Sequence, residues 1–236
     1  MNQFDYTLLL WMNQVADGYP IFTKIMIDIL GDVLKTSFIA ALLWWAWFGN
    51  EGSVRQREVR ERIAACLVAS VACIIVVRLG AALLPFRLRP LANSTIALHF
   101  PLEVGDWGNW SAFPSDNAVM FSMLATCLFT ISRPLGIIAA LDVAFLICFP
   151  RVFLGIHHPT DVFAGAFIGI VAGWLTNRAA IRRRLSMPIF ALMDWHPAVF
   201  YANAFMITFL LALVYWPITR LVISSAKLAR ILLASL

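Results

Sequence analysis

The chain has 236 residues, of which 61% are hydrophobic and only 13% are charged, and its formal net charge is +5. A water-soluble domain of this length needs more polar residues to cover its surface, so the composition excludes a soluble protein and indicates an integral membrane protein. The positive charge does not indicate a nucleic-acid partner. The basic residues stand between apolar segments, where they set topology and contact anionic lipids.

The N-terminal segment, residues 1–32, is amphipathic and is interrupted by Gly18-Tyr19-Pro20. Such a segment lies along a membrane surface rather than across the bilayer, so we predict an interfacial segment here. Its first residues, MNQFDYTLLLW, contain no basic leader and no small-residue cleavage site. We therefore expect no removable signal peptide.

Apolar segments follow that are near the length of about 20 residues needed to cross a bilayer. There are six, at residues 33–49, 63–85, 117–132, 134–153, 160–177 and 199–218. The fourth contains Asp142, a charge that should face the interior of the bundle. The sequence predicts an all-α, polytopic membrane helical bundle of about six spans in a single domain. Its C-terminal part, residues 199–236, should add one or more helices.

Arginines are distributed unevenly between the loops. One set of loops, residues 50–62, Arg133 and residues 178–196, contains nine arginines, whereas the opposite loops, 86–116 and 151–159, contain three. Basic residues accumulate in cytoplasmic loops, so the first set should be cytoplasmic. We predict a bacterial inner membrane protein whose loops 86–116 and 151–159 face the exterior.

The cysteines give no sign of a metal or disulfide site. Cys66, Cys73, Cys127 and Cys148 all lie inside apolar segments, where a cysteine is usually a small buried hydrophobe. No Cys/His cluster has the spacing of zinc ligands, and we expect no metal or other cofactor.

Three segments of the outer loops carry polar residues that a purely structural loop does not need. They are residues 84–90 (LPFRLRP), residues 114–117 (PSDN) and residues 151–161 (RVFLGIHHPTD). Their arginines are Arg87, Arg89 and Arg151. A guanidinium binds phosphate oxygens through two parallel hydrogen bonds and keeps its charge, which indicates a phosphate site. The structural alternative is an arginine that reaches up to the membrane interface.

Ser115, His157 and Asp161 could complete such a site. A hydroxyl and free backbone amides at a helix start favour an anion, although Ser115 could also be an ordinary helix cap. His157 and Asp161 are four residues apart, so their side chains can meet at the start of a helix. The carboxylate would then hold the imidazole in the tautomer whose other nitrogen attacks phosphorus.

Arg151, Gly155, His157 and Asp161 follow the order Arg, three residues, Gly, one residue, His, three residues, Asp. This pattern resembles the third signature of the type 2 phosphatidic acid phosphatase and vanadium haloperoxidase superfamily. Arg89-Pro90 resembles the end of its first signature and Pro114-Ser115 the start of its second, over a core of about residues 63–177. The resemblance implies a metal-independent membrane lipid phosphatase. It also implies that His157 forms a phosphohistidine with Asp161 as its partner, and that Arg89, Ser115 and Arg151 bind phosphate.

Two positions depart from the family pattern. Ala82 stands where the first signature usually has Lys, and Arg87 or Arg78 could supply that charge. Asn117 stands where the second signature ends in the His that acts as general acid. An amide cannot donate a proton as a titrating acid, so Asp116 or His158 would have to replace it if an acid is needed.

The loss of the acid favours a substrate with a good leaving group. A lipid diphosphate releases a phosphate monoester, a stable anion whose second pKa is about 6, whereas a monoester such as phosphatidate releases an alcohol that needs a proton. We therefore favour a polyprenyl diphosphate such as undecaprenyl diphosphate. The alternatives are a catalytically impaired protein that only binds lipid phosphates, and a phosphotransferase. The expected partners are the substrate lipid and the bilayer, with no obligatory protein partner.

Overall fold

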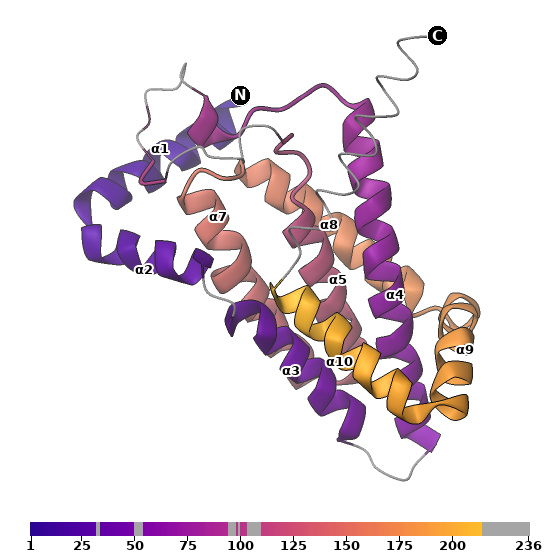
Figure 1. The fold of residues 1–236 in the computed structure, drawn as a ribbon. Coiled ribbons are helices and arrows are strands. Elements are labelled where there is room, and N and C mark those ends of the chain that lie inside the picture. The colour runs from indigo at the N-terminus through magenta and orange to yellow at the C-terminus, as the bar shows by residue number, and fades with distance from the viewer. Residues whose placement is uncertain (32–33, 50–53, 94–97, 99, 103–109, 214–236) are drawn as a thin grey trace.

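The computed structural model describes residues 1–31, 34–49, 54–93, 98, 100–102 and 110–213. All regular elements in these residues are helical, which confirms the predicted class (Figure 1). In chain order they are α1 (Gln3–Gly18), α2 (Pro20–Gly31), α3 (Leu34–Phe48), α4 (Val54–Leu83), the short turn η1 (Pro90–Ala92), α5 (Asp116–Ile131), α6 (Arg133–Asp142), the wider turn η3 (Val143–Cys148), α7 (Phe149–Phe153), α8 (Pro159–Thr176), α9 (Ala179–Trp195) and α10 (Pro197–Leu213).

The count of six membrane spans is not confirmed. In the part of the chain that the structure describes, three helical runs are long and apolar enough to cross a bilayer: Val54–Leu83, Arg133–Phe153 and Pro159–Thr176. Three of the expected spans correspond to shorter apolar helices, Thr36–Phe48, Asp116–Ile131 and Pro197–Phe209. The end of the expected last span and the C-terminal tail, residues 214–236, lie outside the described residues.

Helices α1 and α2 lie beside α7, and α1 also contacts α8, at one end of the bundle (Figure 1). The Asn2 side chain caps α1 by accepting a hydrogen bond of 2.7 Å from the Asp5 amide. The buried face of α1 includes Asp5, Leu9, Met12 and Ala16, which recur at the spacing of one helical face. The buried face of α1 therefore packs against the end of the bundle where α8 begins.

Helices α5 and α8 form the centre of the bundle and approach closely through glycines of α8. An added Cβ at Gly169 would lie 2.2 Å from the carbonyl oxygen of Val119, and one at Gly165 would lie 2.4 Å from that of Ser115. Small residues let two membrane helices approach to backbone contact. This contact fixes the N-terminus of α5 directly against the first turns of α8.

We expect Gly169→Ala to lower the free energy of unfolding by about 1–3 kcal/mol, because the new methyl group would force α5 and α8 apart. The measurement is the thermal unfolding midpoint of the purified protein in detergent. Gly80→Ala on α4 is the matched control, because a Cβ there meets no atom within 4 Å. Equal midpoints for the two variants would contradict the close contact between α5 and α8.

Candidate active site

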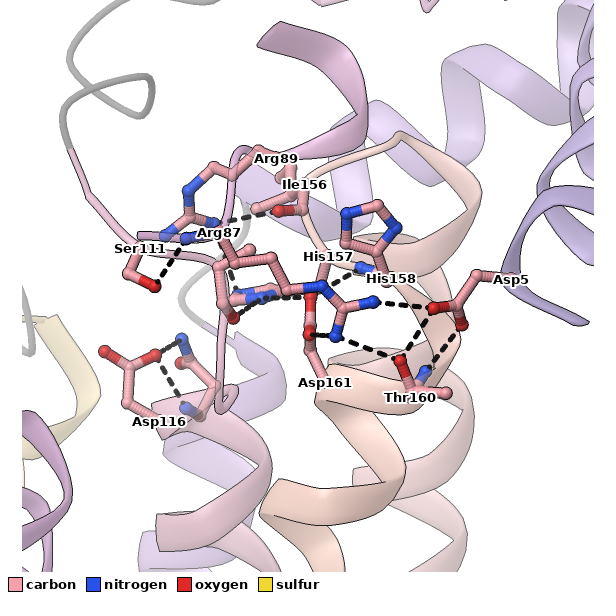
Figure 2. A network of polar contacts seen from close by, with 12 residues as sticks. Asp5, Arg87, Arg89, Ser111, Asp116, Ile156, His157, His158, Thr160 and Asp161 are labelled. Carbon is pink, nitrogen blue, oxygen red and sulfur yellow. Dashed lines mark hydrogen bonds and ion pairs between the residues drawn. The ribbon is translucent and has the colours of Figure 1, made fainter. Parts of the chain in front are cut away.

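The polar segments predicted from the sequence meet where α4 ends and where α5 and α8 begin. Arg89 follows α4, Ser115 immediately precedes α5, and His157 lies in the turn between α7 and α8. Figure 2 shows Arg89, His157 and Asp161 in one network of polar contacts. Ser115 joins this region through its backbone, because its amide donates to the carbonyl of Asp161 at 3.1 Å.

His157 is almost completely buried, with 2% of its surface exposed. Its Nδ1 lies 2.9 Å from the carbonyl oxygen of Ala112, and its Nε2 lies 3.3 Å from Nη1 of Arg89. A carbonyl only accepts hydrogen bonds, so we assign the proton to Nδ1 and the lone pair to Nε2. The ring therefore presents its unprotonated nitrogen on the side of Arg89.

Asp161 does not make the hydrogen bond to His157 that the sequence analysis expected. Its Oδ2 lies 3.9 Å from Nδ1 of His157, which is an electrostatic contact but too long for a hydrogen bond. The same oxygen accepts from the amide of His158 at 2.8 Å, as part of the cap of α8. The group that fixes the imidazole tautomer is the Ala112 carbonyl. Sequence reasoning missed it because a backbone carbonyl leaves no mark in a side-chain pattern.

Arg89 is also buried, with 3% of its surface exposed, and its Nη1 donates to the carbonyl of Ile156 at 2.9 Å. Burial lowers the pKa of the Arg89 guanidinium to about 10, and the nearby charge of Arg78 acts in the same direction. A group with this pKa is still protonated at neutral pH. Arg89 therefore places a positive charge beside the unprotonated nitrogen of His157.

Arg151 lies beside Asn117, the position at which the family's general acid is expected. Nη2 of Arg151 donates to Oδ1 of Asn117 at 2.9 Å, and Nη1 donates to the carbonyl of Ile147 at 2.5 Å. The amide nitrogen of Asn117 lies on the other side, 3.4 Å from Oδ1 of Asp116. Asn117 thus holds Arg151 in place through its oxygen and offers no titrating proton.

The surroundings of the Ser115 hydroxyl favour a ligand-binding role over the role of an ordinary helix cap. Ser115 is fully buried, and its hydroxyl makes no hydrogen bond to α5. Its Oγ has no hydrogen-bond partner within the described part of the chain. A buried hydroxyl without a partner costs free energy and calls for an explanation, which a bound phosphate oxygen would supply.

Arg87 is held by two carboxylates. Its Nη2 donates to Oδ2 of Asp5 at 2.7 Å, while Nη1 donates to Oγ1 of Thr160 at 3.1 Å and forms an ion pair with Asp161 (Figure 2). Two carboxylates therefore neutralise this guanidinium, which does not support the predicted role of Arg87 as a phosphate ligand. Asp5 is a further residue that sequence reasoning missed, because it stands in the N-terminal segment far from any signature.

The other residues considered as substitutes are engaged as well. Arg78, deep in α4, forms a buried ion pair with Asp116 and lies over the ring of Trp110, with its guanidinium carbon 5.6 Å from the ring centroid. Nε2 of His158 lies 3.0 Å from the carbonyl of Leu88. Asp116 is thus held by Arg78, and His158 is held through Nε2, while its Nδ1 is buried without a hydrogen-bond partner in the described part of the chain.

The electrostatic surroundings keep His157 neutral. Burial lowers the pKa of its imidazole well below the ordinary value, and the positive charges of Arg89 and Arg151 lower it further. The hydrogen bond to the Ala112 carbonyl acts in the opposite direction but does not outweigh them. Neutral imidazole has a free lone pair at neutral pH, as a nucleophile requires.

The lowered pKa of His157 predicts how kcat/KM should depend on pH in the acidic range. If Nε2 of His157 is the nucleophile, its protonation blocks attack, so kcat/KM, which reports the free enzyme, should rise with pH through the pKa of His157 and then level off. Because this pKa is lowered, the midpoint of the rise should lie below about 6.5, the ordinary value for histidine. Phosphate release from a lipid substrate between pH 4 and 8 measures this, and a midpoint above 7 would contradict it.

A helical membrane bundle with a neutral imidazole beside buried arginines agrees with the membrane lipid phosphatase that the sequence predicts, and the comparisons with known proteins support this class. The chain belongs to the PAP2 superfamily, whose family model matches residues 64–185. It is an integral membrane protein and a hydrolase of phosphate esters. No solved structure shows a significant match to it.

Three curated bacterial relatives match most of the chain. Lipid A 4'-phosphatase of Bacteroides thetaiotaomicron is 29% identical over 184 residues, which cover 74% of this chain and 76% of that protein. "Putative undecaprenyl-diphosphatase YbjG" of Escherichia coli is 25% identical, covering 72% and 80%. Bacitracin transport permease protein BcrC of Bacillus licheniformis is 27% identical, covering 69% and 73%.

Proposed function

We propose that this protein hydrolyses a polyprenyl diphosphate at the outer face of a bacterial inner membrane, through a phosphohistidine at His157. The observation that carries the proposal is the placement of Nε2 of His157, with its lone pair, 3.3 Å from Nη1 of Arg89. The buried and unpartnered hydroxyl of Ser115 supports it. The arginine-poor loops that carry the site support the outward orientation.

The reaction takes place in two displacements. Nε2 attacks the terminal phosphorus, a P–N bond forms, and the P–O bond to the lipid monophosphate breaks. Arg89 and Arg151 supply positive charge for the oxygens of the transferring phosphoryl group, and the Ser115 hydroxyl supplies a hydrogen bond. Water then attacks the phosphohistidine, which releases inorganic phosphate and restores the neutral ring. Nδ1 keeps its proton throughout, held by the Ala112 carbonyl.

Asn117 determines the choice of substrate. With the Arg151 guanidinium on its oxygen, this amide stabilises negative charge nearby but cannot protonate a leaving alkoxide. A lipid monophosphate leaves as a stable anion and needs no proton, whereas the alcohol released from a monoester does. Of the two relatives whose names state a substrate, one name refers to undecaprenyl diphosphate and the other to lipid A. Asn117 favours the diphosphate for this chain.

The test is phosphate release by the purified protein from a prenyl diphosphate and from phosphatidate, each compared with Asn117→His. We expect the wild type to prefer the diphosphate. The variant should gain about 10-fold or more on phosphatidate and little on the diphosphate, because a positioned acid is worth about 10²–10⁴-fold where the leaving group is poor.

Other outcomes of the same assay identify the alternatives. A wild type that cleaves both lipids equally contradicts the proposed preference. A nearly inactive wild type that the substitution activates on both lipids identifies an impaired lipid-phosphate binder. Product that forms only when a second acceptor is present identifies a phosphotransferase.

A further inference from the structure

The N-terminal helix α1 reaches the catalytic region through Asp5. This carboxylate is fully buried. Its Oδ1 accepts from the amide of Thr160 at 3.0 Å, and its Oδ2 accepts from the hydroxyl of Thr160 at 2.7 Å and from Arg87 at 2.7 Å (Figure 2). Asp5 thus binds the first turn of α8, three residues after His157.

Arg87 extends this connection to the other side of the imidazole. Its side chain joins Asp5 and Asp161, and its carbonyl accepts from the amide of Ala112 at 2.8 Å. The carbonyl of Ala112 is the group that accepts from Nδ1 of His157. Two paths therefore lead from Asp5 to His157: one runs through Thr160 and the backbone at the start of α8, and the other through Arg87 and Ala112.

The charges of the cluster indicate that Asp5 is not needed merely to neutralise a cation. Arg87 already pairs with the buried carboxylate of Asp161, so Asp5 adds a second negative charge to one guanidinium. A buried charge opposes folding unless its hydrogen bonds are complete, as those of Asp5 are. A carboxylate can accept on both oxygens at once, which lets Asp5 hold the Thr160 amide, the Thr160 hydroxyl and Arg87 together.

We propose that Asp5 is a positioning residue for His157 and that α1 is therefore part of the catalytic apparatus. This inference rests on the proposed function. Asp5 touches neither the substrate nor the reacting atoms. It acts by fixing the turn that carries the nucleophile and, through Arg87, the carbonyl that sets its tautomer.

The experiment compares Asp5→Asn with Asp17→Asn in the purified full chain. Asp17 is an exposed acid on the same helix and is the matched control. We expect kcat of Asp5→Asn on a prenyl diphosphate to fall about 10- to 100-fold, because small misplacements of a reacting group have effects of that size. KM should stay within about threefold, since Arg89, Arg151 and Ser115 are unchanged. Asp17→Asn should match the wild type.

A double-mutant comparison separates positioning from a general loss of stability. Thr160→Val removes only the hydroxyl that Asp5 and Arg87 share, and should lower kcat about threefold or more at an unchanged thermal midpoint. Because both substitutions interrupt one network, the losses in the double variant should be less than multiplicative. If Asp5→Asn fails to fold, Thr160→Val alone provides the test.

Each result decides the proposal. A selective fall in kcat with non-multiplicative losses supports it. An active wild type whose kcat is unchanged in Asp5→Asn, or in Thr160→Val where the first variant does not fold, overturns the positioning role and leaves the proposed function intact. Fully multiplicative losses also overturn it. Absence of phosphate release by the wild type from any lipid phosphate overturns both proposals.

Discussion

Replacement of His157 by alanine should abolish turnover, with a loss of at least about 10³-fold in kcat, because the variant has no atom to receive the phosphoryl group. The effect should fall on kcat rather than on substrate binding, since Arg89, Ser115 and Arg151 remain. In the wild type, rapid quenching after mixing with phosphorus-labelled diphosphate should trap label on the protein. This label should be lost in acid, because protonation turns the imidazole into a good leaving group, and it should be absent from His157→Ala.

His158→Ala is the neighbouring control for this experiment. His158 accepts no phosphoryl group in the proposed reaction, so the variant should still form the labelled intermediate. The rate should be lower if the substitution makes the turn between α7 and α8 less rigid. Label that persists in His157→Ala, or label on any other residue, would contradict the assignment of the nucleophile.

The substitution Arg89→Lys should lower kcat/KM by about 10²-fold although the positive charge is kept. Loss of one preorganised donor to a transition-state oxygen typically has an effect of about 10²–10³-fold. Nη1 of Arg89 contacts both the Ile156 carbonyl and Nε2 of His157. A lysine ammonium lacks the planar guanidinium fork that binds two phosphate oxygens through parallel hydrogen bonds. The measurement is steady-state phosphate release, with vanadate inhibition as a second reading of anion affinity.

Arg133→Lys is the matched control, because Arg133 is exposed at the start of α6 and contacts none of the site residues described above. It should have wild-type kinetics. An Arg89→Lys variant with wild-type kcat/KM would show that charge alone is sufficient at this position and would contradict the role of the guanidinium geometry.

Much of the fold follows from composition and apolar run length, because a bilayer admits few backbone arrangements besides helices. The number of crossings does not follow in the same way. Asp116–Ile131 and Pro197–Phe209 are apolar but short, and length alone does not establish that such helices cross. The close contact of α5 and α8 could be suspected from Gly165 and Gly169 on one face of a helix, but the partner helix could not.

The site was predictable where the chemistry requires particular side chains at fixed spacing. Arg89, Ser115, Arg151 and His157 do lie at one end of the bundle, as their placement in outer loops implied. The environment of Arg87 was not predictable, since its partner Asp5 is separated from it by 82 residues. The carbonyl of Ala112 was invisible for a different reason, because every residue carries one.

The burial of His157 has a consequence for chemical labelling. Histidine-directed acylating reagents need an accessible ring nitrogen, yet His157 exposes 2% of its surface and His158 only 3%. His196, by contrast, is exposed beside Trp195 at the C-terminal end of α9. Among the histidines that the structure describes, such a reagent should therefore modify His196 first, without inactivation. A slower second phase of modification, at the buried histidines, would report how often the closed site opens to small molecules from outside.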